Sequence, residues 1–331
     1  MPEIYGTLGP ACADAAILEQ MLHLGMTGVR LNLSHVTLLE AEGELEALTL
    51  AAQRVGVRPK LLIDMQGPEL RVGALREPLR LTEGELVPLA ALSLPEIVTR
   101  ELTAGMELLL DDGKLLVRLE GEPNALCGRV LHGGLLRGRK SVAVPGLNVS
   151  LPALTEADRR NLRAAASYGV TGLMQPFVRS REDLEAVRAA MAEAGCPNLR
   201  LFAKIENRTG LEKLPELIGT ADEIVIARGD LGNAVPLWAL PRVQKEIAAA
   251  CRKAGRPFMV VTQMLASMEH SPVPTRAEVS DIFNAVLDGA ASVMVTGETA
   301  AGEYPVEVLR YLSSTVREAE NYLNHRKEQT T

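Results

Sequence analysis

Aromatic residues are scarce in this 331-residue chain: they make up 3% of it, and Trp238 is the only tryptophan. Proteins that bind single-stranded nucleic acid stack bases on aromatic side chains, so this scarcity argues against that class. The 35 lysines and arginines are outnumbered by 42 aspartates and glutamates, which gives a net charge of −7. A basic stripe for nucleic acid or a polybasic membrane anchor is not indicated, and we expect no nucleic-acid partner and no membrane association.

Cysteine is rare and widely spaced. Cys12, Cys127, Cys196 and Cys251 form no Cys-x-x-Cys pair, which argues against a zinc site and against a disulfide framework. The first residues lack the basic and apolar regions of a secretion signal, and a transmembrane protein is excluded by the composition. These absences predict a cytoplasmic protein.

The sequence does contain a regular alternation of apolar runs and amphipathic stretches. Eight apolar runs predict strands, at residues 3–8, 28–33, 60–65, 169–175, 199–206, 223–227, 258–262 and 291–296. Predicted helices cover residues 13–26, 37–54 and 240–255, and others begin at Thr155, at Ser180, at Thr275 and near Pro305. Short connections between strand, helix and strand predict a parallel sheet.

Residues 67–148 differ from the rest, because they combine short Val/Leu runs with many Gly and Pro turns and no convincing helix. They predict a small all-β domain. The flanking residues 1–66 and 149–321 together approach the ~250 residues of a (β/α)8 barrel. The predicted fold class is therefore α/β, a (β/α)8 TIM barrel with a small all-β domain inserted after barrel strand 3, followed by a frayed tail at residues 322–331. A doubly wound open sheet is the alternative, although no Gly-x-Gly-x-x-Gly turn supports it.

Polar residues follow several of the predicted strands at their C-terminal ends, where the active sites of such barrels lie. Glu206 and Asp230, after neighbouring strands, offer the oxygen ligands that Mg²⁺ prefers. Lys204 beside them offers a positive charge to a phosphoryl group or an enolate. A Lys204–Glu206 ion pair that only closes the barrel is the alternative; the additional charges of Arg30, Asp64 and Asp230 argue against it.

A series of motifs resembles the pyruvate kinase family, in the family's order, over residues 4–321. They are RLNLSH (30–35), DMQGPELR (64–71), LLLDDG (108–113), LPALTEAD (151–158), FVR (177–179), AKIEN (203–207), IARGDLG (226–232), TQMLASM (262–268), PTRAEVSD (274–281), NAVLDG (284–289) and GETAAGEYP (297–305). The family's barrel carries a β-rich domain after its third strand, in agreement with the predicted organisation. The resemblance implies phosphoryl transfer from phosphoenolpyruvate to ADP in glycolysis, which gives pyruvate and ATP and depends on Mg²⁺ (or Mn²⁺) and K⁺.

The resemblance also implies residue roles. The implied Mg²⁺ ligands are Glu206 and Asp230, and the implied K⁺ ligands are Asn32, Ser34, Asp64 and the carbonyl of Met65; Glu69 matches potassium-dependent members. The implied catalytic residues are Lys204, Arg30, Arg71 and Thr262. Substrate would be bound by Arg30, Lys204, Gly229, Asp230 and Thr262, and nucleotide by Asn32, His35, Arg71 and Lys140. Such an arrangement suits phosphoryl transfer, which needs positioned charge more than covalent help.

The chain departs from the family pattern at Met65-Gln66, where Thr-Lys is usual, at Pro176, where Ser is usual, and at Ala143. The family's C-terminal effector domain is absent, so we expect no control by a sugar phosphate and a possible homodimer through the barrel. Two alternatives remain open. One is a catalytically weak binding or regulatory paralogue, motivated by these departures. The other is a metal-dependent carbon–carbon lyase of the same barrel type, although a lyase needs no nucleotide lid.

Overall fold

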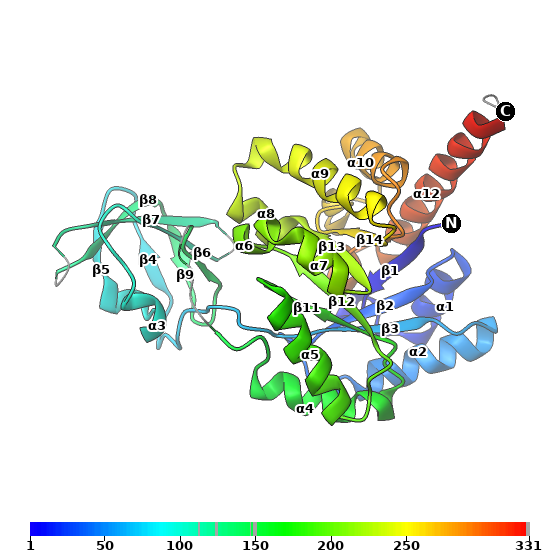
Figure 1. Cartoon of the computed structure of the whole chain (residues 1–331), viewed down its shortest axis with the longest axis horizontal. Helices are drawn as coiled ribbons and strands as arrows, with labels where there is room; N and C mark the ends of the chain where they lie inside the picture. The colour runs from blue at the N-terminus through cyan, green and yellow to red at the C-terminus, as the bar shows by residue number, and fades with distance from the viewer. Residues whose placement is uncertain (112, 123–124, 146, 148–150, 329–331) are drawn as a thin grey trace.

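The structure, a computed structural model, describes residues 1–111, 113–122, 125–145, 147 and 151–328; the predicted domain boundary at residues 148 and 149 lies outside them. Eight parallel strands form a closed barrel in the order β1-β15-β14-β13-β12-β11-β3-β2 (Figure 1). Their bounds are β1 Glu3–Thr7, β2 Gly28–Asn32, β3 Lys60–Asp64, β11 Gly172–Gln175, β12 Arg200–Ile205, β13 Glu223–Ala227, β14 Phe258–Val261 and β15 Ser292–Met294. The predicted α/β barrel is confirmed, and the open sheet is wrong.

Helices follow the barrel strands and pack around them. Their bounds are α1 Ala15–His23, α2 Glu42–Val55, α4 Glu156–Ala165, α5 Arg181–Glu193, α6 Arg208–Glu212, α7 Leu214–Thr220, α8 Arg228–Ala234, α9 Leu240–Lys253, α10 Arg276–Leu287, α11 Gly297–Ala300 and α12 Pro305–Glu328. Capping boxes at Thr155 and Thr275 start α4 and α10, as their sequences predict. Single 3₁₀ turns lie at Pro10–Cys12, Ala166–Tyr168, Leu237–Ala239 and Ala266–Glu269. Among the described residues, no helix has both the length and the apolar character that a membrane crossing requires.

Two helix boundaries differ from the sequence prediction. The helix expected from residue 37 begins at Glu42, because Thr37 instead donates its backbone N–H and its hydroxyl to the Glu40 carboxylate in a local turn. The tail expected from residue 322 is wrong as far as Glu328, since α12 continues to that residue. The Tyr322 ring packs 5.7 Å from the Phe283 ring of α10, whereas the described side chains from Asn324 to Glu328 are exposed.

Between β3 and β11 the chain forms two small antiparallel sheets, which project to one side of the barrel, beyond α6 and α8 (Figure 1). One sheet has the order β10-β6-β7-β8-β5 and the other pairs β4 with β9. The bounds are β4 Leu79–Leu81, β5 Leu86–Pro88, β6 Glu107–Leu110, β7 Leu115–Glu120, β8 Cys127–His132, β9 Gly134–Leu136 and β10 Val142–Ala143. The expectation of no helix here is wrong, because a 3₁₀ turn (Leu89–Leu92) and α3 (Glu96–Thr99) connect β5 to β6.

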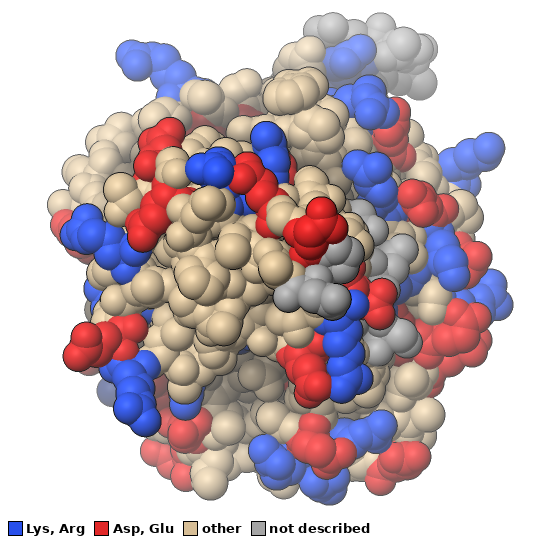
Figure 2. All heavy atoms as spheres, turned by 90° about the vertical axis from the view of Figure 1, so that its left-hand side faces the viewer, with Lys and Arg blue, Asp and Glu red and all other residues tan. Residues whose placement is uncertain are grey.

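The two small sheets enclose a core of their own, with Val72, Leu92, Leu108, Val117 and Leu136 buried in it. Figure 2 shows the face at this end of the molecule, where Lys and Arg alternate with Asp and Glu around a broad uncharged area. Alternation of the two signs gives this face little net electrostatic attraction for a polyanion. The bounds 67–148 for an inserted domain stay a prediction.

The barrel interior is filled by side chains that point inward from its strands. These are Tyr5, Leu62, Met174, Phe202, Val225, Ala227, Met259, Val261 and Met294. Close packing here requires glycine at position 28, because a Cβ added there would lie 2.4 Å from Cε1 of Tyr5. The interior is thus a packed core, and the two cavities described below lie beyond the strand ends.

At the amino-terminal end of the barrel, Glu223 is buried and closes the interior. Its carboxylate accepts a hydrogen bond from Ser292 Oγ at 2.5 Å and lies 2.7 Å from Nη2 of Arg200. Burial raises the pKa of Glu223, and the Ser292 hydrogen bond and the Arg200 charge only partly oppose this effect. Side chains at this end of a barrel contribute to stability rather than to catalysis.

We expect Glu223→Ala to lower the free energy of unfolding by about 2–3 kcal/mol, because it leaves Ser292 without its acceptor and removes the nearer of the two carboxylates that pair with the half-exposed Arg200. Glu223→Gln, which keeps a hydrogen-bond acceptor, should lose less. Urea denaturation measures both, with Glu318→Ala on the exposed face of α12 as the control. Equal midpoints for Glu223→Ala and Glu318→Ala would show that the buried network adds no stability.

Candidate active site

A cavity of about 140 Å³ lies at the carboxyl ends of β2, β3, β12 and β13. Its lining residues are Arg30, Asn32, Ser34, Asp64, Met65, Gln66, Glu69, Arg71, Pro176, Phe177, Lys204, Glu206 and Asp230. Most of the predicted site residues therefore lie together. The structure places Thr262, Gly229, His35 and Lys140 outside this lining.

Lys204 lies between two buried carboxylates. Its Nζ is 3.1 Å from Oδ2 of Asp64 and 3.0 Å from Oε1 of Glu206, and its side chain is 13% exposed. Arg30 also pairs with Asp64, with Nη2 2.6 Å from Oδ2. The Lys204–Glu206 pair that the sequence suggests is therefore one contact in a network of two cations and two acids.

The network fixes the charges of its members. Burial raises the pKa of Asp64, but the positive charges of Lys204 and Arg30 outweigh this effect, so the pKa of Asp64 lies below its ordinary value. Burial alone would lower the pKa of Lys204; the negative charges of Asp64 and Glu206 raise it well above the ordinary value. Lys204 is thus a fixed positive charge near the cavity floor.

Glu206 has an excess of negative charge around it. Burial raises its pKa, Lys204 opposes that rise, and the nearby carboxylates of Asp230 and Asp64 add to it. Its Oε2 accepts a hydrogen bond of 2.8 Å from the backbone N–H of Phe177, which orients the carboxylate. A bound cation would relieve this repulsion, so the donor chemistry of Glu206 and Asp230 fits a divalent metal ion that takes its other ligands from water and substrate.

Asp158 holds the loop that follows β3, a role that its capping motif does not reveal. Its fully buried carboxylate accepts hydrogen bonds from the backbone N–H groups of Gln66 (2.8 Å) and Gly67 (3.0 Å) while it caps α4 through Thr155. The same loop packs against Pro176, since a Cβ added to Gly67 would lie 2.5 Å from Cγ of Pro176. These contacts fix the backbone next to Asp64 and Met65.

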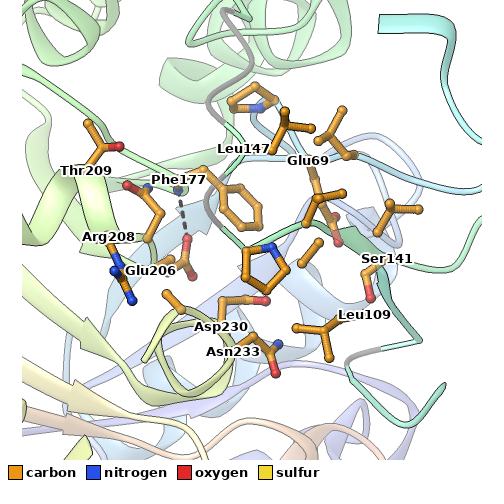
Figure 3. A pocket seen from close by; sticks show the side chains of 18 of the residues that line it. Glu69, Leu109, Ser141, Leu147, Phe177, Glu206, Arg208, Thr209, Asp230 and Asn233 are labelled. Carbon is orange, nitrogen blue, oxygen red and sulfur yellow. Dashed lines mark hydrogen bonds between the residues drawn. The ribbon is translucent and has the colours of Figure 1, made fainter. Parts of the chain in front are cut away.

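A second cavity, of about 290 Å³, adjoins the first and shares Glu69, Phe177, Glu206 and Asp230 with it (Figure 3). It lies between the barrel residues 206–209 and the connections to the small sheets, residues 68–70 and 141–145. Figure 3 shows the Phe177 ring beside the Glu206 carboxylate, with Asp230 and Asn233 across from Leu147. Movement of the small sheets relative to the barrel would change the size of this cavity.

The predicted site residues that do not line the smaller cavity lie elsewhere. The side chain of Thr262 lies against Gly229, where a Cβ would be 3.1 Å from its Cγ2. Lys140 pairs with Asp111 of the small sheets at 2.8 Å. His35 is exposed. Among the described residues there is no group of three or more His, Cys, Asp or Glu side chains that could hold a metal ion.

Comparison with known proteins gives consistent matches. The family model described as "Pyruvate kinase, barrel domain" matches residues 2–309. A pyruvate kinase of Aeropyrum pernix is 39% identical over 317 residues, which cover 94% of this chain and 69% of that protein. The pyruvate kinase of Geobacillus stearothermophilus is 34% identical and the human pyruvate kinase PKLR is 37% identical; each match covers 98% of this chain. The chain spans only 58% and 60% of the length of these two relatives.

Proposed function

The chain belongs to the pyruvate kinase family, and from this premise we propose that it transfers a phosphoryl group from phosphoenolpyruvate to ADP, which gives pyruvate and ATP. The observation that carries the proposal is the position of Lys204, held between Asp64 and Glu206 at the floor of a cavity. A fixed positive charge in a site of low dielectric stabilises negative charge that develops during a reaction.

Three cationic side chains line the smaller cavity and would bind the phosphoryl group: Arg30, Arg71 and Lys204. Arg30 and Lys204 both contact Asp64, and Arg71 is held by Glu69, with Nη2 2.5 Å from Oε2. Each cation is oriented by a carboxylate, so little reorganisation is needed when the substrate enters. Together they would bind the phosphoryl oxygens, with Lys204 also facing the enolate oxygen.

Two ion sites accompany this arrangement. Glu206 and Asp230 would hold Mg²⁺ or Mn²⁺, and the ion, when bound, neutralises charge on the phosphoryl and enolate oxygens. Asn32, Ser34, Asp64 and the carbonyl of Met65 would hold K⁺. Support for the second site is that all four residues line the smaller cavity, where the backbone beside Met65 is fixed by Asp158.

Thr262 and the N-terminus of α8 would contact the part of the substrate away from the phosphoryl group, which is the carboxylate and the carbon that is protonated. The N–H groups of Gly229 and Asp230 belong to the first turn of α8, where the helix dipole favours a negative charge, so they would suit the substrate carboxylate. Thr262 packs against Gly229 and would deliver the proton that converts the enolate to pyruvate. The nucleotide would be contacted by Asn32, His35, Arg71 and Lys140. The small sheets would cover it as a lid.

The test is a coupled assay of the purified chain with phosphoenolpyruvate, ADP, Mg²⁺ and K⁺, repeated without each component. We expect pyruvate formation that requires both ADP and a divalent cation, and that falls when Na⁺ replaces K⁺. Pyruvate formation no faster than in the enzyme-free control would contradict the proposal. Pyruvate released from a hydroxy-keto acid without ADP would indicate the lyase alternative.

A catalytically weak paralogue is the second candidate, because the departures Met65, Gln66 and Pro176 all line the smaller cavity. Proline at position 176 cannot donate the backbone or hydroxyl hydrogen bond that a serine would offer beside Lys204. Calorimetry with phosphoenolpyruvate in the presence of Mg²⁺ separates the two candidates. Binding without turnover favours the paralogue, and turnover at ordinary enzyme rates excludes it.

A further inference from the structure

The guanidinium of Arg228, at the start of α8, clamps the loop that follows β14. Its Nε and Nη2 donate hydrogen bonds to the carbonyl oxygen of Thr262, at 3.1 and 2.7 Å, and Nη2 also lies 3.0 Å from Sδ of Met264. Its Nη1 pairs with Oδ2 of Asp281 on α10 at 2.6 Å. The side chain is only 10% exposed, and it lines neither cavity. Arg228 therefore joins three parts of the fold: the start of α8, the loop after β14 and α10.

The clamped loop has an unfavourable backbone conformation. Thr262 has φ +77° and Gln263 has φ +54°, two successive non-glycine residues in the left-handed region. Such residues cost about 1–3 kcal/mol each and persist only where their surroundings hold them, particularly when the side chain is β-branched. The two hydrogen bonds from Arg228 fix the carbonyl of the first of these residues. Further along the loop, the N–H of Leu265 donates to Glu298 at 3.1 Å.

The turn brings the Thr262 side chain to the N-terminus of α8. Its Cγ2 lies so near Gly229 that an added Cβ would be 3.1 Å away. Gly229 precedes Asp230, a proposed metal ligand that lines both cavities. With an ordinary negative φ, Thr262 would direct its side chain elsewhere, so the position of its hydroxyl depends on the strained turn and on the residue that holds it.

We propose that Arg228 is a positioning residue for protonation of the enolate, an inference that rests on the function proposed above. In that step the O–H bond of Thr262 breaks, a C–H bond forms at the methylene carbon, and the enolate electrons form the new bond as the ketone appears. Thr262 Oγ then regains a proton from water. Arg228 contributes through the Thr262 carbonyl and contacts no reacting atom.

The test compares Arg228→Met with Arg228→Lys and with Arg242→Met, an exposed arginine of α9 that pairs with Glu246. For Arg228→Met we expect kcat to fall about 10- to 100-fold, the scale for a misplaced reacting group, with KM for phosphoenolpyruvate within threefold. Exchange of the pyruvate methyl hydrogens in D₂O with Mg²⁺, K⁺ and ATP present, followed by NMR, should fall by a similar factor. Mn²⁺ affinity should not change, and Arg228→Lys, which keeps one donor, should recover part of both rates.

Methyl exchange in Arg228→Met within twofold of the Arg242→Met control would overturn the proposal, and so would an equal loss of Mn²⁺ affinity. A crystal structure of Arg228→Met provides a measurement that needs no activity. In it, φ of Thr262 should leave the left-handed region. An unchanged φ would show that Arg228 does not hold this turn. If the parent chain itself forms no pyruvate, the proposed function fails while the crystal structure still decides the role of Arg228. Should Arg228→Met not fold, Arg228→Lys carries the same comparisons.

Discussion

Lys204→Met should lower kcat by about 10²–10³ or more, the scale of losing one preorganised charge contact in a transition state. Methionine has a similar length and fills the space of the lysine stem, but it offers no charge to the phosphoryl group or the enolate. Asp64 keeps its pair with Arg30, so the carboxylate remains neutralised on one side. The measurement is kcat in the coupled assay at saturating phosphoenolpyruvate, ADP and Mg²⁺.

The matched control is Lys213→Met, the same substitution at an exposed lysine between α6 and α7. Far-ultraviolet circular dichroism and Mn²⁺ binding should remain close to the parent values in both variants, although Lys204→Met leaves Glu206 without its cation and should lower stability. A kcat for Lys204→Met within about twofold of the parent would show that Lys204 is only a structural partner of the two acids. The role assigned to it would then be wrong.

The barrel itself follows from the sequence to a large extent. Parallel strands covered by helices are buried on both faces, so they appear as short continuous apolar runs, and every predicted run overlaps a barrel strand. The polarity of residues 322–328 suggests a frayed tail, but α12 includes them. The Tyr322 ring of α12 contacts the Phe283 ring, which is distant in sequence, and no local pattern reports such a contact.

The candidate site could be predicted only as a set of residues, without its contacts. Charges at strand ends indicate which side chains gather at one end of the barrel, because parallel strands end together. That Lys204 reaches Asp64 as well as Glu206 depends on the strand order, in which β11 alone separates β3 from β12. The left-handed backbone of Thr262 was not predictable either, since threonine disfavours that region and the Thr262 carbonyl accepts hydrogen bonds from Arg228, which is distant in sequence.

Glu206→Gln should affect the metal requirement more than the chemical step. Glutamine has the shape of glutamate, and its carbonyl oxygen can still accept the hydrogen bond from the Phe177 N–H. It removes one formal charge from the pair that Glu206 forms with Asp230, so we expect the Mg²⁺ concentration for half-maximal rate to rise at least about tenfold. Titration of the initial rate with Mg²⁺, together with direct Mn²⁺ binding, measures the change.

Glu212→Gln provides the matched control for this substitution, because Glu212 is exposed and lines the larger cavity without lining the smaller one. At saturating Mg²⁺, Glu206→Gln should recover a larger share of the parent kcat than Lys204→Met does, since excess metal can offset weakened binding but cannot replace the lysine charge. A Mg²⁺ requirement equal to that of Glu212→Gln would exclude Glu206 as a metal ligand. The excess negative charge around Glu206 would then have to be balanced by Lys204 alone.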